Sequence, residues 1–167
     1  ASGGVTTADY NNDGLMDILF LDGVQCRLYR HAGISSNGSV RFEDVTTETQ
    51  LEGLDRAHCG LFADFDNDGD KDLFVSRYGA PNRLYVNENN VYVDRSSEWG
   101  MDFLGPCVSA TCLDYDRDGF PDIYVAVNGD AVNESSLLKI CFVIGFSSVK
   151  IYLSEAESFP PCHRVPN

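Results

Sequence analysis

The sequence predicts an all-β protein, a partial β-propeller of about two to three four-stranded antiparallel blades. Three observations lead to this prediction. An acidic segment occurs three times, a short apolar run rich in β-formers follows each copy, and no stretch shows a 3.6-residue apolar period over more than two turns. The chain has 167 residues, of which 43% are hydrophobic, so it can build a packed core. We therefore expect one globular unit or a piece of one.

The repeat consists of nine residues that begin at Asp9, Asp64 and Asp114, with the sequences DYNNDGLMD, DFDNDGDKD and DYDRDGFPD. Similarity continues beyond these segments in the first two units. Arg-Leu-Tyr at 27–29 corresponds to the same tripeptide at 83–85, and Phe-Glu-Asp-Val-Thr at 42–46 corresponds to Tyr-Val-Asp-Arg-Ser at 92–96. The first unit is longer, and we expect an inserted loop at 34–38.

Each repeat unit supplies four expected strands. One apolar stretch precedes the acidic segment, as at 60–63, and a second follows it, at 18–21, 73–75 and 123–127. Continuous apolarity over a few residues between glycine-containing turns indicates a strand that is buried on both faces. The Arg-Leu-Tyr and Phe-Glu-Asp-Val segments add two more strands. Four short strands in about 50 residues are the size of one propeller blade.

The repeats divide the chain into a repeat region, 1–129, and a divergent tail, 130–167. Within the repeat region we expect blades at about 4–56, 57–106 and, incomplete, 107–129. The tail has no counterpart of the Arg-Leu-Tyr or Asp-Val-Thr segments. It is either a replacement β-hairpin, with strands at 140–144 and 149–153, or foreign sequence from a truncated or misjoined reading frame.

The acidic segments have the residue pattern of a metal-binding loop. Acidic or amide residues at positions 1, 3 and 5 followed by glycine at position 6 bring several oxygens to one point, where repulsion between carboxylates opposes folding unless a cation is bound. Oxygen ligands without His or Cys select Ca²⁺ or Mg²⁺, and crowded carboxylates favour Ca²⁺. An EF-hand is excluded, because position 12 is Phe20, Val75 or Val125 in place of Glu and the flanks are strands.

We predict that Ca²⁺ is bound by the side chains at positions 1, 3, 5 and 9 and by the backbone carbonyl at position 7 of each loop. These residues are Asp9, Asn11, Asp13, Leu15 and Asp17; Asp64, Asp66, Asp68, Asp70 and Asp72; and Asp114, Asp116, Asp118, Phe120 and Asp122. Asn11 removes one charge and weakens the first site relative to the other two. The side chain of Asp70 is expected to point to solvent.

Charge and motifs exclude several classes of function. With 12 Lys and Arg against 26 Asp and Glu, the net charge of -14 repels a phosphate backbone, so we expect no nucleic-acid partner. The most apolar stretch, 137–153, contains two lysines, and we expect no membrane span. The three histidines lie in no catalytic motif, so we expect a protein that is not an enzyme. Six cysteines leave two alternatives open, disulfides of an exported protein or buried free thiols.

The segments 63–75, 82–87 and 92–96 resemble the FG-GAP/VCBS-type repeats, which also build the N-terminal β-propeller of integrin α chains. The Arg-Leu-Tyr and Phe-Glu-Asp-Val-Thr segments are most similar to the cartilage acidic protein (ASPIC/UnbV-type) group. The resemblance covers about residues 4–129. Family propellers have about seven blades, whereas this chain has two units and the opening of a third. Terminal blades therefore expose apolar surface unless missing blades or self-association cover it.

The resemblance implies calcium sites in strand-connecting loops of a secreted or cell-surface protein engaged in adhesion and extracellular recognition. The expected function is that of a non-catalytic calcium-binding repeat protein, whose partner is an extracellular protein or a glycan. Two alternatives stay open. The chain is a propeller fragment of a larger Ca²⁺-dependent enzyme that acts on polysaccharides or lipids, or it is a truncated, non-functional fragment.

Overall fold

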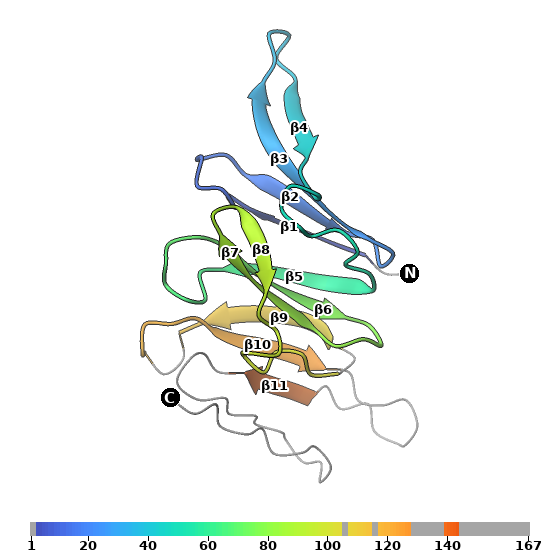
Figure 1. Ribbon diagram of the computed structural model, residues 1–167, viewed down its shortest axis with the longest axis vertical. Helices are drawn as coiled ribbons and strands as arrows, with labels where there is room; N and C mark the ends of the chain where they lie inside the picture. The colour runs from blue at the N-terminus through green and yellow to red at the C-terminus, as the bar shows by residue number, and fades with distance from the viewer. Residues whose placement is uncertain (1–2, 105–106, 115–116, 128–138, 144–167) are drawn as a thin grey trace.

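The computed structural model describes residues 3–104, 107–114, 117–127 and 139–143, and within them the fold consists of antiparallel β-sheets without a helix. Blade 1 has the strand order β1-β2-β3-β4, blade 2 the order β5-β6-β7-β8, and blade 3 the order β11-β10-β9. The three blades follow one another along the long axis of the molecule (Figure 1). The all-β prediction is confirmed, and the sheets are consistent with blades of a partial propeller.

The strands have the following bounds. Blade 1 contains β1 (Gly4–Ala8), β2 (Asp17–Leu21), β3 (Cys26–Ile34) and β4 (Val40–Asp44); blade 2 contains β5 (Ala57–Ala63), β6 (Asp72–Arg77), β7 (Arg83–Glu88) and β8 (Val91–Asp94); blade 3 contains β9 (Cys107–Leu113), β10 (Asp122–Val127) and β11 (Lys139–Val143).

Each acidic segment joins the first two strands of its blade, as predicted. Loop 1 (residues 9–17), loop 2 (64–72) and loop 3 (114–122) have the same register, because the residue before each loop pairs with the aspartate at position 9: Ala8 with Asp17, Ala63 with Asp72, and Leu113 with Asp122. The third loop is described in part, since Tyr115 and Asp116 lie outside the described residues. The expected insertion at 34–38 coincides with the turn of an extended β3–β4 hairpin.

The hydrophobic core consists of two layers that lie between blades. The first layer joins blades 1 and 2 and includes Leu19, Leu21, Leu28, Leu73 and Val75. The second layer joins blades 2 and 3 and includes Phe65, Phe74, Leu84, Ile123 and Val125. Side chains alternate between the faces of a strand, so β6 places Leu73 and Val75 toward blade 1 and Phe74 toward blade 3. The strand after loop 2 is thus buried on both faces, as predicted.

For β2 the prediction of burial on both faces is wrong. Leu19 and Leu21 are buried against blade 2, whereas Phe20, on the opposite face, is 46% exposed. The same outer face carries two more exposed apolar side chains, Val5 and Phe42. Val5 of β1 pairs with Phe20, and Phe42 of β4 pairs with His31 of β3. The physical reason is position: no described element packs against the outer face of blade 1.

Blades 1 and 2 approach closely at their first strands, β1 and β5. Gly60 of β5 has no side chain, and a Cβ at this position would come within 3.3 Å of the side chains of Leu21, Thr6 and Leu19 in blade 1. Gly4 of β1 is similarly close to the backbone of His58. Interblade packing therefore disfavours a side chain at both positions, most strongly at Gly4, where the Cβ would lie 2.7 Å from the His58 carbonyl oxygen.

The second repeated motif, Asp-x-Thr/Ser, closes each of the first two blades. In blade 1 the Thr46 hydroxyl donates to Asp44 (2.6 Å) and accepts from the backbone N–H of Leu28 (3.0 Å). In blade 2 the Ser96 hydroxyl makes the same two contacts, with Asp94 and with Leu84 N–H. The arginine of each Arg-Leu-Tyr segment pairs with this aspartate, at 3.2 Å in both blades. The motif is therefore structural.

The divergent tail contributes a strand to blade 3. Lys139–Val143 forms β11 and pairs antiparallel with β10, in agreement with the first strand of the expected hairpin. The second expected strand, 149–153, lies outside the described residues. Cys26, Cys59, Cys107 and Cys112 are free thiols, and the side chains of Cys141 and Cys162 are outside the described part. Among the described residues, no helix is long and apolar enough to cross a membrane.

Candidate metal centre

The three loops share a pattern of hydrogen bonds between carboxylates and backbone amides. The aspartate at position 1 accepts from the N–H of the glycine at position 6, at 2.8 Å for Asp9, 3.0 Å for Asp64 and 3.2 Å for Asp114. The aspartate at position 5 accepts from the N–H at position 7 in all three loops, at 2.8 to 2.9 Å. The glycine at position 6 has a φ of 84° to 99°, a backbone conformation that residues with a side chain rarely adopt. The repeated sequence therefore encodes one local loop conformation.

The aspartate at position 9 joins the loop to the sheet. Asp72 is fully buried, and its two oxygens accept from the N–H of Phe65 in the loop (2.7 Å) and from the N–H of Asn87 in β7 (2.9 Å). Asp17 makes the same contacts with Tyr10 N–H (3.1 Å) and His31 N–H (2.8 Å). This carboxylate is therefore held in a fixed position by backbone donors on both sides.

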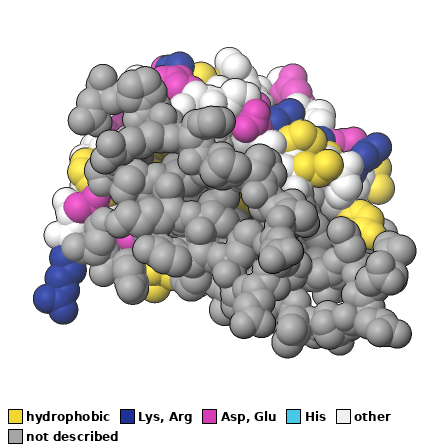
Figure 2. Space-filling view, turned by 90° about the horizontal axis from the view of Figure 1, so that it is seen from below, with side chains coloured by type: hydrophobic (Ala, Val, Ile, Leu, Met, Phe, Trp, Pro, Cys, Tyr) yellow, Lys and Arg dark blue, Asp and Glu magenta, His cyan; other side chains and the backbone are white. Residues whose placement is uncertain are grey.

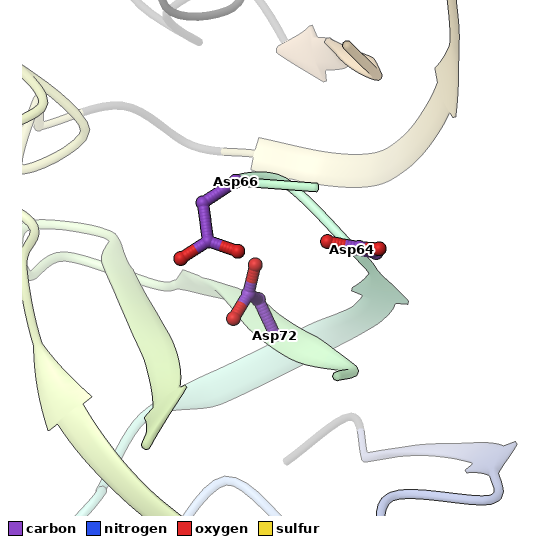
Figure 3. A group of neighbouring side chains, drawn as sticks. All are labelled: Asp64, Asp66 and Asp72. Atoms are coloured by element: carbon purple, nitrogen blue, oxygen red, sulfur yellow. The ribbon is translucent and has the colours of Figure 1, made fainter. Parts of the chain in front are cut away.

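Loop 2 brings three carboxylates together. Oxygens of Asp64, Asp66 and Asp72 all lie within 4.8 Å of one another, the only such group of metal-ligand residues found in the described part of the chain. Asp64 and Asp66 come from the loop between β5 and β6, while Asp72 begins β6 (Figure 3). The carboxylates of Asp66 and Asp72 face each other. All three donors are oxygens, which suits Ca²⁺ or Mg²⁺.

The electrostatics of loop 2 favour a cation. Burial, with smaller contributions from Asp66 and Asp68, raises the pKa of Asp72 to about 7, although two backbone N–H groups oppose this effect. Burial is also the largest cause that raises the pKa of Asp66, and the nearby charges of Asp68 and Asp64 act in the same direction. A bound cation would lower both pKa values, because it offsets the cost of placing negative charge at this position. The residues of loop 2 therefore fit a divalent ion.

Loop 1 has the same hydrogen bonds from backbone amides to carboxylates, and it has an amide side chain in place of a carboxylate at position 3. Asn11, at position 3, accepts from Asp13 N–H through Oδ1 and donates to the Asp13 carboxylate through Nδ2, at 3.3 Å and 3.0 Å. One oxygen of Asp13 is thus engaged by an amide. Burial raises the pKa of Asp17, and the charges of Asp13 and Asp9 add to this effect. The substitution of Asn for Asp at position 3 accordingly lowers the negative charge of this loop.

The other predicted ligands are placed as follows. Asp68 is exposed and accepts from Asp70 N–H, and Leu15, at position 7, is 38% exposed. In loop 3, Asp122 is buried, Asp114 and Asp118 are exposed, Phe120 is half-buried, and Asp116 lies outside the described residues. The structure brings together three carboxylates of the predicted set, and all three belong to loop 2.

The Asp70 side chain, expected to point to solvent, is half-buried and accepts a hydrogen bond from Asn12 of loop 1 at 2.8 Å. Three asparagines that the sequence did not single out also contact the loops. Asn12 and Asn67 occupy position 4 of loops 1 and 2, and Asn87 lies in β7. Position 4 repeats as Asn in two loops, and this repetition is the sequence signal that could have identified it.

Acidic and basic side chains are interspersed along the margin of the end that carries blade 3 (Figure 2).

Comparison with known proteins agrees with the repeat pattern. No curated protein matches the chain. The model of the FG-GAP-like repeat family matches residues 9–75 and, in a second and overlapping match, residues 64–125. Both matches begin at the first aspartate of an acidic loop and end within the strand after the next loop. Together they cover more than half of the chain, which therefore belongs to the FG-GAP-like repeat family.

Proposed function

We propose that this chain is a non-catalytic, calcium-binding repeat module, in which the ions stabilise the loops between the first two strands of each blade. One observation carries the proposal: oxygens of Asp64, Asp66 and Asp72 lie within 4.8 Å of one another, and Asp72 is buried. Three carboxylates so close together repel one another unless a cation is bound. Loop 2 is the strongest site of the proposal, and loop 1 is a weaker one.

Calcium is favoured over other metals by the donor set. Loop 2 offers several carboxylates and a backbone carbonyl, with no imidazole or thiolate among the predicted ligands. Ca²⁺ accepts six to eight oxygens in flexible geometry, whereas Mg²⁺ requires six in a nearly ideal octahedron and retains water. When it is bound, the ion supplies positive charge that allows the carboxylates to ionise together. Asp64 and Asp66 would hold it from the loop, and Asp72 from the start of β6.

Calorimetric titration with Ca²⁺, together with thermal melts in Ca²⁺ and in EDTA, tests this function. Binding to the folded state alone stabilises a protein by about 2.7 kcal/mol when the free ion is at 100 times its Kd. We therefore expect saturable binding and a higher melting temperature in Ca²⁺ than in EDTA or Mg²⁺. Absence of both effects would overturn the proposal.

Matched variants distinguish a specific site from general attraction to an acidic protein. Asp72→Asn removes the buried carboxylate of loop 2 and should abolish the tightest binding. Glu52→Gln removes one negative charge at an exposed position outside the loops and should leave binding unchanged. Equal weakening by both substitutions would indicate only nonspecific attraction by the net charge of -14.

The proposed setting is extracellular, on a secreted or cell-surface protein engaged in adhesion or recognition. This part of the proposal depends on the resemblance to integrin α propellers and to the cartilage acidic protein group, together with the predicted calcium sites. The partner would be an extracellular protein or a glycan. Further blades or a second copy would cover the outer face of blade 1, where Val5, Phe20 and Phe42 are exposed. Sedimentation of the chain in Ca²⁺ over a range of concentrations tests self-association.

A further inference from the structure

Loops 1 and 2 touch each other through an asparagine side chain. The Nδ2 of Asn12, at position 4 of loop 1, donates to the Asp70 carboxylate at 2.8 Å and to the carbonyl oxygen of Gly69 at 3.3 Å. Both acceptors belong to loop 2, more than fifty residues away in the sequence. The contact is repeated one blade later, where Asn67 Nδ2 of loop 2 donates to the carbonyl oxygen of Gly119 in loop 3 at 2.8 Å.

The backbone at position 4 explains how the same contact arises twice. Asn12 and Asn67 have φ values of 58° and 62°, in the left-handed region that asparagine tolerates better than most residues. Both side chains are exposed, so their order comes from the contact with the next loop, since no core surrounds them. Asn at position 4 thus combines the required backbone conformation with a donor that reaches the adjacent blade.

A second asparagine joins the same two loops. Asn87 is fully buried in β7, where its N–H donates to Asp72 of loop 2. Its side-chain Nδ2 donates to the carbonyl oxygen of Tyr10 in loop 1 at 2.9 Å and to that of Lys71 in loop 2 at 3.3 Å. Loop 1 and loop 2 are therefore held in register from the surface by Asn12 and from the interior by Asn87.

The two acceptors of the Asn12 amide, Gly69 and Asp70, belong to the part of loop 2 that must keep a fixed conformation if it is to bind a metal ion. Gly69 N–H donates to Asp64 at 3.0 Å, while Gly69 C=O accepts from Asn12, so this peptide segment is held on both sides. The next residue is Asp70, whose carbonyl is the predicted position 7 ligand. Asn12 also supplies a neutral donor to the Asp70 carboxylate, which adds no charge between two acidic loops.

We propose that Asn12 is a positioning residue for the metal site of loop 2, so that this site in blade 2 depends on a side chain from the preceding blade. This inference rests on the proposed calcium function.

A calcium titration that resolves the individual loops tests this dependence. The N–H groups of Gly14 and Gly69, both at position 6, are separate reporters of loops 1 and 2 in ¹H–¹⁵N NMR spectra. The substitution Asn12→Gly removes the amide and retains the left-handed backbone, which glycine adopts readily. We expect the affinity reported by Gly69 to fall by roughly 3- to 10-fold, the range of one lost hydrogen bond. The affinity reported by Gly14 should change by less than about twofold, because it depends on loop 1's own ligands.

Two further variants serve as controls. Asn12→Asp retains a side chain of the same shape and places a carboxylate against the Gly69 carbonyl and Asp70, so it should weaken loop 2 more than Asn12→Gly does. Asn89→Gly makes the same replacement at an exposed asparagine of similar φ, 57°, outside the loops, and should leave both reporters unchanged. A larger effect of Asn12→Gly on Gly14 than on Gly69, or equal effects on both, would overturn the inference.

The inference and the proposed function can fail separately. If Gly69 of the unaltered chain does not respond to Ca²⁺, the calcium function is wrong, and the positioning role is then measured in EDTA by amide hydrogen exchange. Gly69 N–H and Asp70 N–H donate to Asp64 and Asp68, and both should exchange faster in Asn12→Gly than in the unaltered chain. Unchanged exchange would show that Asn12 does not position loop 2.

Discussion

Blades 1 and 2 have closely similar repeat sequences and the same hydrogen bonds from backbone amides to loop carboxylates, yet their surroundings differ. Blade 2 has a core layer on both faces, whereas blade 1 has one on a single face. Phe74 of β6 is fully buried, while Phe20 of β2 is 46% exposed. The difference teaches that the repeat determines the local conformation, while a neighbouring blade determines burial and, through burial, the electrostatics of the loop.

The largest expected difference between the two blades concerns the core. Phe74→Ala should lower the free energy of unfolding by about 3–5 kcal/mol, because it leaves a cavity between blades 2 and 3. Phe20→Ala should lower it by less than about 1 kcal/mol, because the ring contacts Tyr29 at an exposed surface. Urea unfolding in saturating Ca²⁺ measures both values.

A gentler pair keeps this comparison measurable if Phe74→Ala does not fold. Phe74→Leu should cost about 1 kcal/mol or more, since it removes part of a buried ring. Phe20→Leu should have a smaller effect. Equal losses for the two leucine variants would contradict the claim that blade 1 lacks a neighbour on its outer face.

The second expected difference is the response of the two loops to pH. The pKa of Asp72 is raised to about 7, so below that pH a proton competes with Ca²⁺ in loop 2. The affinity of loop 2 should fall by up to about tenfold for each pH unit below 7, one proton per ion. The pKa of Asp17 is raised by a smaller amount, so loop 1 should weaken only at lower pH. Titrations between pH 8 and pH 5.5, monitored at Gly14 and Gly69, measure both effects.

Without metal, the same group should act on stability in the opposite direction. The pKa of Asp72 in the folded chain lies above its ordinary value of 3.8, so the folded state binds more protons between about pH 4 and pH 7. Its contribution to stability is complete below about pH 4 and is lost as the pH rises through 7. Melting temperatures in EDTA should therefore fall less with rising pH for Asp72→Asn than for the unaltered chain, and parallel curves would contradict this assignment.

A reciprocal exchange at position 3 sharpens the comparison of the loops. Asn11→Asp gives loop 1 the charge of loop 2, and Asp66→Asn gives loop 2 the residue of loop 1. We expect Asn11→Asp to raise the calcium affinity of loop 1, and Asp66→Asn to lower that of loop 2, each by about tenfold, as expected for one additional charged ligand. Calorimetry and the Gly14 and Gly69 resonances measure the change. If the two affinities do not change in this way, the difference in calcium affinity between the two loops comes from burial and not from ligand charge.

The smallest expected difference concerns the ion pairs of the Arg-Leu-Tyr segments. Arg27 pairs with Asp44 and Arg83 with Asp94, with the arginine side chains 45% and 29% exposed. Each substitution by Gln should cost less than about 1 kcal/mol, with the larger loss for the less exposed Arg83. Unfolding at low and high salt measures both effects, and a loss well above this limit for Arg27 would show a structural role that its exposure does not suggest.

The strand positions and the carboxylates of the loops could be predicted because they depend on local rules. A run of apolar β-formers after a glycine-containing turn forms a strand, and aspartate at positions 1 and 5 accepts backbone hydrogen bonds within its own loop. The role of Asn12 could not be predicted in this way, because its acceptors in loop 2 are more than fifty residues away. Gly60 is similar, since its lack of a side chain is explained only by the residues of blade 1 that pack against it.

By itself, the sequence determined the four-strand unit, the loop at the start of each blade, the family and the aspartates that could bind a metal ion. These features follow from the pattern of neighbouring residues, which fixes backbone conformation over a few positions. Only the tertiary structure decided which carboxylates converge, which face of β2 is exposed, and which asparagines join adjacent loops. Burial and contacts between blades decide these properties, and both depend on the neighbour that packs against each sheet, because an isolated blade cannot bury both of its faces.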